Sequence, residues 1–115
     1  MKEKNLPDGD KRVTNDPMEA TYIGIKMWAQ AVEQAGTTDV NAVRQAVAGQ
    51  VVRGPTGMNI TMDLKNHHLH KPVFIGEVKA DGQFNVVWKT KGPVRAAPWS
   101  PYIAGNEKKK DAPEL

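Results

Sequence analysis

The sequence predicts a mixed α/β chain, in which two helices are followed by short strands, a β-hairpin and an irregular tail. Apolar residues recur at helical spacing in the first half, and they alternate with polar residues around residues 58–62. Prolines then punctuate the last quarter. With 115 residues, 39% of them hydrophobic, the chain has room for one modest core.

The first helix is expected over residues 17–35. Asp16 is the expected N-cap, because its carboxylate can accept from free backbone N–H groups, and Pro17 suits the first helical position. Glu19 follows three residues later, as in a capping box, and Gly36 is the expected stop. The side chains expected on the apolar face are Met18, Tyr22, Ile25, Trp28 (or Ala29) and Val32.

A shorter second helix is expected between residues 38 and 49. Thr38 or Asp39 is its expected cap, and Gly49 ends it. Its apolar stripe consists of Val40, Val43 and Val47. A tight turn joins the two helices into a helical hairpin.

The second half of the chain is expected to form strands. Residues 51–52 are a short extended piece, and the alternation over residues 58–62 predicts a half-buried strand. The segment 63–71 has the composition of a polar loop.

Residues 73–89 are predicted to form a β-hairpin. Asp81-Gly82 favours a two-residue type I′ turn, because both central positions of that turn need positive φ. The implied register places Ile75 opposite Trp88 and Glu77 opposite Val86. Both faces carry apolar side chains, so we expect both to be covered.

The tail from residue 93 onward is rich in proline, which does not suit a regular strand. We expect it to pack along a surface through Trp99 and Tyr102. Residues 106–115 are polar, and we expect them to be disordered.

Composition excludes several classes of function. The net charge of +3 is too small to indicate a nucleic-acid partner. Without cysteine there is no disulfide or thiolate chemistry. No apolar run approaches the roughly 18 residues of a membrane span, and the residues after Met1 lack the apolar stretch of a signal peptide.

No active site is predicted. His67, His68 and His70 are spaced poorly for zinc, so no metal is expected. Ser100 is the only serine and has no nucleophile elbow around it. Asp16 and Glu19 form a possible carboxylate pair that helix capping also explains. We therefore expect neither an enzyme nor a cofactor.

Several stretches resemble one family. They are residues 13–20 (VTNDPMEA), 66–73 (NHHLHKPV), 75–84 (IGEVKADGQF) and 99–102 (WSPY). Together they are similar to the C-terminal region of the substrate-binding proteins of urea ABC transporters. These proteins are grouped with leucine/isoleucine/valine-binding and amide-sensing proteins. The likeness covers residues 11–105.

The resemblance implies the C-terminal portion of a type I periplasmic binding protein fold, in which three crossing segments join two α/β lobes. It implies four parts. Residues 1–14 are a polar lead-in that ends the second lobe, and residues 15–72 carry the helical hairpin and a strand of the first lobe. Residues 73–92 form the hairpin of the second lobe, and residues 93–115 are the tail. Because each piece would lack its usual neighbours, we expect the isolated chain to be marginally stable or to self-associate.

The implied function is binding of urea or a short-chain amide between the lobes and its delivery to an ABC permease. The parent protein would be periplasmic. The resemblance places Asn15, Asp16 and Glu19 near the ligand, and His67, His68 and His70 at the hinge between the lobes. An amide-sensing regulator and a branched-chain amino acid-type binding protein are the alternatives.

Overall fold

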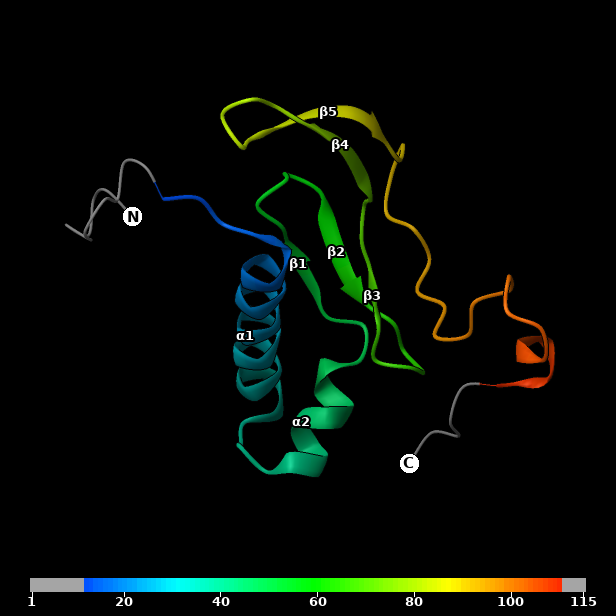
Figure 1. The fold of residues 1–115 in the computed structure, drawn as a ribbon. Helices are drawn as coiled ribbons and strands as arrows, with labels where there is room; N and C mark the ends of the chain where they lie inside the picture. The colour runs from blue at the N-terminus through cyan, green and yellow to red at the C-terminus, as the bar shows by residue number, and fades with distance from the viewer. Residues whose placement is uncertain (1–11, 111–115) are drawn as a thin grey trace.

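The computed structural model describes residues 12–110, which form one helix–sheet unit, a separate β-hairpin and a folded tail (Figure 1). The elements, in chain order, are α1 (Asp16–Ala35), α2 (Val40–Val47), β1 (Val51–Arg53), β2 (Asn59–Met62), β3 (Leu69–His70), β4 (Phe74–Val78), β5 (Phe84–Lys89) and the 3-10 helix η2 (Asn106–Lys108). Residues 1–11, which belong to the expected polar lead-in, lie outside the described part.

Helix α1 has the predicted length, but its cap is Asn15, not Asp16. The Asn15 side chain accepts from the backbone N–H of Met18 at 3.0 Å, so Asp16 becomes the first helical residue. Asn15 is as good a cap chemically, because its amide oxygen reaches the same free N–H group. Gly36 ends the helix with φ of 68°, as expected.

The buried face of α1 is not the expected one. Ile23, Met27 and Ala31 are fully buried, the first two against Val52 and Ile60 of the sheet, whereas Trp28 is 52% exposed. The expected stripe of Met18, Tyr22, Ile25 and Trp28 faces outward. Both stripes have helical spacing, and the one chosen is the one that meets the sheet.

Helix α2 packs beside α1 as a helical hairpin, which confirms that prediction. Asp39 caps it by accepting from the Ala42 N–H at 3.0 Å. Val43 is buried, but Val40 is 71% exposed, so the expected stripe is only partly correct.

The helices cover a three-stranded antiparallel sheet of order β1–β2–β3. Strand β2 confirms the predicted alternation, because Ile60 is fully buried and pairs with Val52 of β1. These two residues and Ile23 and Met27 of α1 form the core cluster. Strand β3 was expected to be loop; Leu69 and His70 pair with β2, and that pairing turns residues 63–68 into a hairpin loop.

Strands β4 and β5 form the predicted hairpin with a different turn. Lys79 N–H donates to the Gln83 carbonyl at 2.7 Å, which leaves the three residues 80–82 in the loop, and Gly82 has φ of 81°. This is the three-residue loop with a glycine in the left-handed region. Glu77 therefore pairs with Asn85, and a bulge after Ile75 restores the predicted partner Trp88.

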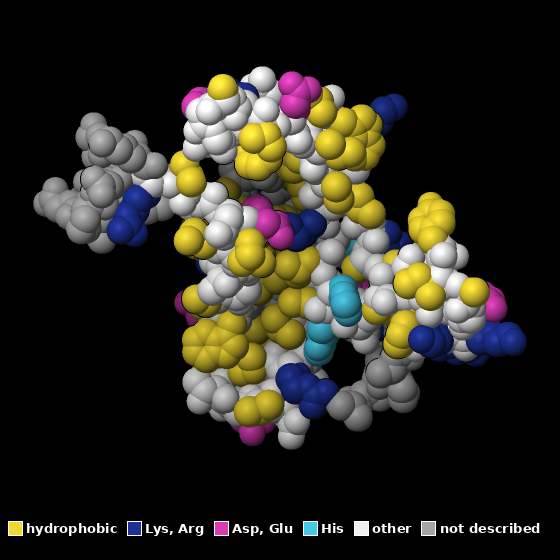
Figure 2. Space-filling model, viewed as in Figure 1, with side chains coloured by type: hydrophobic (Ala, Val, Ile, Leu, Met, Phe, Trp, Pro, Cys, Tyr) yellow, Lys and Arg dark blue, Asp and Glu magenta, His cyan; other side chains and the backbone are white. Residues whose placement is uncertain are grey.

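The hairpin was expected to be covered on both faces, and in this chain it is not. Every residue of β4 and β5 is exposed. Figure 2 shows apolar side chains gathered over the hairpin and along α1. The hairpin lies beyond the end of the β1–β3 sheet and does not pair with it.

The tail is more ordered than expected. Asn106, which was expected to be disordered, is buried and is the first residue of η2. Its side chain donates to the Ser100 carbonyl at 3.0 Å. Trp99 donates to the Lys110 carbonyl, while Tyr102 is 95% exposed and packs on no surface. Residues 111–115 of the expected disordered end lie outside the described part.

Candidate functional site

The candidate site lies where the start of α1 meets the link between β3 and β4. Lys71, the first residue of this link, places its Nζ 3.6 Å from Asp16 Oδ1 and 3.7 Å from Glu19 Oε2. In Figure 2, acidic and basic side chains meet at the waist of the molecule, below the hairpin. The segment that the resemblance places near the ligand is thus in contact with the residue that follows the expected hinge histidines.

The three residues expected near a ligand have different tasks. Asn15 is committed to the helix, because its side-chain oxygen accepts from Met18 and its carbonyl accepts from the Glu19 N–H at 3.1 Å. Asp16 is freed from capping, and its side chain is 85% exposed. Glu19 is withdrawn further, with 22% of its side chain exposed.

Lys71 is the site residue that the sequence alone does not single out. It stands far from Asp16 and Glu19 in the chain, and it appears in the sequence only as one member of the 66–73 stretch. Its relevance depends on β3 ending beside the start of α1. The one available signal was a lysine directly after the expected hinge histidines, opposite in charge to the two carboxylates expected near the ligand.

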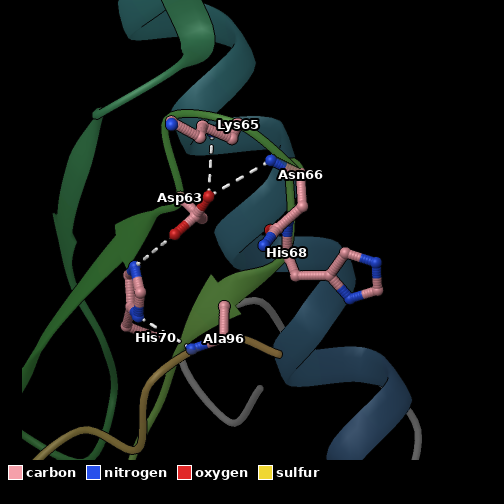
Figure 3. Close-up of polar contacts among 6 residues, drawn as sticks. All are labelled: Asp63, Lys65, Asn66, His68, His70 and Ala96. Atoms are coloured by element: carbon pink, nitrogen blue, oxygen red, sulfur yellow. Dashed lines mark hydrogen bonds and ion pairs between the residues drawn. The ribbon is translucent and has the colours of Figure 1, made fainter. Parts of the chain in front are cut away.

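A second polar cluster surrounds His70, the residue directly before this link (Figure 3). His70 Nδ1 accepts from the backbone N–H of Ala96 at 2.8 Å, and His70 Nε2 lies 3.2 Å from Asp63 Oδ2. Because Nδ1 accepts, the neutral ring carries its proton on Nε2 and donates it to Asp63. His70 thus ties β3, the 63–68 loop and the tail together.

The three expected hinge histidines are not brought together. His70 lies in this cluster, whereas His67 and His68 are exposed on the loop. The His68 ring points away from Asp63 and His70 (Figure 3). His67 has φ of 54°, a left-handed conformation that costs a residue with a side chain some strain. Within residues 12–110, no group of three or more His, Cys, Asp or Glu side chains is placed to hold a metal ion.

Asp63 is the electrostatic centre of the second cluster. Backbone N–H groups of Lys65 and Asn66 donate to Oδ1 at 2.9 and 3.1 Å. These bonds, Lys65 first, hold the pKa of the Asp63 carboxyl below its ordinary value of 3.8. Partial burial opposes the shift; the positive charge of His70 when that ring is protonated, and the charge of Arg95, reinforce it.

This lowered pKa predicts a loss of stability in acid. The unfolded state binds its proton more tightly than the folded state, so the stabilisation is present above the ordinary pKa and lost as pH falls through the folded value. We expect the free energy of unfolding, measured by urea titration between pH 5 and pH 2, to fall with decreasing pH. Asp63→Asn should flatten part of this slope; an unchanged slope would contradict the assignment. Asp81, whose pKa is also lowered by the Gln83 N–H and by Lys79, should contribute separately.

The mixed helix-and-strand fold is consistent with part of a solute-binding domain. Residues 2–105 match the family described as periplasmic binding protein domain, so the chain belongs to that family. The helix-and-strand architecture is consistent with part of a type I periplasmic binding protein fold. Among the described residues, no helix is long and apolar enough to cross a bilayer.

One curated relative is a limonene hydroxylase from Geobacillus stearothermophilus. It is 36% identical over 90 residues, which cover 78% of this chain and 16% of that protein. The chain therefore spans about a sixth of the length of the relative it matches.

Proposed function

We propose that this chain forms part of the solute-binding component of an ABC importer for urea or short-chain amides. In the periplasm, the solute would bind between two lobes. The closed form would then deliver it to a permease in the membrane. The observation that carries the proposal is the contact of two linking segments through Asp16, Glu19 and Lys71.

The carboxylates of this junction suit an amide. A small neutral amide has N–H groups that need acceptors once closure has removed water. Asp16 and Glu19 supply carboxylate oxygens at one end of α1, and the positive charge of Lys71 offsets the repulsion between these two negative charges. Asn15 holds the helix start and is a positioning residue.

The exposed apolar faces support a role within a larger protein. They comprise Met18, Tyr22, Ile25 and Trp28 on α1, and Phe74, Ile75, Val78, Phe84, Val86, Val87 and Trp88 on the hairpin. Soluble monomers rarely expose contiguous apolar patches of this kind, and a lone two-stranded hairpin is marginally stable. We infer that further segments of the solute-binding protein cover these faces. In the isolated chain, a second copy would do so.

We further infer that this segment has no catalytic role. His70 has both ring nitrogens engaged, one by Ala96 and the other by Asp63, so neither is available to move a substrate proton. Ser100 has no histidine partner among its hydrogen bonds; its hydroxyl accepts from Tyr102 N–H. The match to the limonene hydroxylase covers 16% of that protein, so its name describes a protein that is mostly outside the matched stretch.

Calorimetry with urea, acetamide and leucine tests the proposal. We expect the full-length protein that carries this segment to bind urea or acetamide, and the isolated chain to bind neither, because we infer that further segments of the protein complete the cleft. Binding of leucine instead would favour the branched-chain amino acid alternative. Binding of no solute by the full-length protein would overturn the proposal. Amide binding without permease-dependent uptake would favour the amide-sensing alternative.

A further inference from the structure

Lys71 is held loosely by its two acidic neighbours. Its Nζ lies 3.6 Å from Asp16 and 3.7 Å from Glu19, whereas a charge-assisted N–H···O bond is about 2.7–2.9 Å long. Within the described residues, these ion pairs are the only contacts of the Lys71 ammonium group closer than 4 Å to an acidic oxygen. Its three N–H donors therefore have capacity for another acceptor.

The trio is also exposed unequally. The side chains of Lys71 and Glu19 are 23% and 22% exposed, while Asp16 is 85% exposed. A partly buried ammonium group without a close hydrogen bond is costly, and a solute that supplies an acceptor recovers part of that cost. Lys71 and Glu19 thus form the withdrawn side of the site, and Asp16 its open side.

The backbone holds Lys71 firmly in place. Its carbonyl accepts from the Val94 N–H at 2.7 Å, and the residue bridges to the tail there. His70 before it is paired with Thr61 of β2, and Pro72 after it is buried. Such fixation on both sides limits the ordering cost when the ammonium group binds a solute.

We propose that Lys71 is the residue that recognises the solute's carbonyl oxygen. Its Nζ donates to that oxygen. Asp16 and Glu19 accept from the N–H groups of the amino nitrogen bonded to the same carbonyl carbon. The class of ligand is a small neutral molecule with a primary amide group. The two carboxylates and one ammonium sum to one negative charge, which disfavours an anion, and a cation would compete with Lys71. This inference rests on the proposed function and names its specificity-determining residue.

Calorimetry on the full-length protein tests this role with three variants. Lys71→Met removes the donors and keeps most of the side-chain length; we expect affinity for urea or acetamide to fall about 10- to 100-fold, because a bond to a charged donor is lost. Lys71→Arg keeps the charge and donors and should retain part of the affinity. Lys91→Met removes an exposed lysine between the hairpin and the tail and is the matched control. Its affinity should stay within about twofold of wild type.

A second measurement does not depend on a folded variant. In the wild-type protein, the Lys71 side-chain NMR signals should shift when acetamide is added, and the Lys91 signals should not. If wild type binds an amide but Lys71→Met binds it equally well, or if the Lys71 signals stay fixed at saturation, the role of Lys71 is overturned and the proposed function survives. If wild type binds no amide, both proposals fail together.

Discussion

Replacing Ile60 by alanine is expected to lower the free energy of unfolding by about 2–5 kcal/mol. Ile60 is fully buried at the centre of the cluster that joins β2 to α1. The hydrophobic core of the described part comprises only six buried side chains, so this core is small. Because domains are stable by only about 5–15 kcal/mol, the loss would consume a large share of the total.

Thermal and urea unfolding of Ile60→Ala and Ile103→Ala measure this effect. Ile103 loses the same atoms in the tail, where it is 60% exposed, so its substitution should change stability by less than about 0.5 kcal/mol. For a domain of this size, each kcal/mol corresponds to roughly 4–8 °C in Tm. Equal effects of the two substitutions would show that the cluster around Ile60 is not the stabilising core.

A third variant separates the core from the exposed faces. Ile25 is 63% exposed on the outer stripe of α1. Ile25→Ala should be nearly neutral in the isolated monomer, and destabilising in any assembly that covers this stripe. Comparison of this chain with the full-length protein therefore reports whether further segments pack there.

Helix α1 illustrates what sequence periodicity can and cannot establish. Its start and end are local matters: a capping side chain, a proline and a left-handed glycine at position 36 suffice. Its buried face is not local. Met18, Tyr22 and Ile25 have the same spacing character as Ile23, Met27 and Ala31, and only the position of the sheet distinguishes them.

The hairpin and β3 show the same division. Asp81-Gly82 correctly marks a turn, but the choice between a two- and a three-residue loop shifts the register by one, and the bulge after Ile75 shifts it back. Strand β3 is two residues long in a polar stretch, so nothing in its own composition indicates pairing. It becomes a strand because β2 offers an edge.

The candidate site follows this pattern too. The resemblance places Asp16 and Glu19 near a ligand, and the structure shows both of them within 4 Å of Lys71 Nζ. The contact with Lys71 arises from tertiary structure, as does the engagement of His70 by the Ala96 backbone. Neither contact can be read from the sequence, because each joins residues that are far apart in the chain.

Replacing His70 by phenylalanine is expected to release the tail from the sheet. The ring volume is nearly kept, but the Ala96 N–H loses its acceptor and Asp63 loses its donor. Leaving such groups unpaired costs about 1–3 kcal/mol. We expect the Ala96 amide to exchange its hydrogen about 5- to 150-fold faster, the same cost expressed as a rate, while the amides of β2 change little.

Hydrogen exchange of wild type, His70→Phe and His68→Phe distinguishes a local fastening from a general loss of stability. His68 is the matched control, because its ring is exposed and points away from the cluster. Unchanged exchange at Ala96 in His70→Phe would contradict the fastening. Faster exchange confined to the tail would show that His70 fastens the tail locally. His70 contacts the tail through Ala96. The next residue, Lys71, bridges to Val94 of the tail and also forms the ion pairs with α1. A loosened tail should then also weaken solute binding, although His70 itself lies outside the proposed ligand contacts.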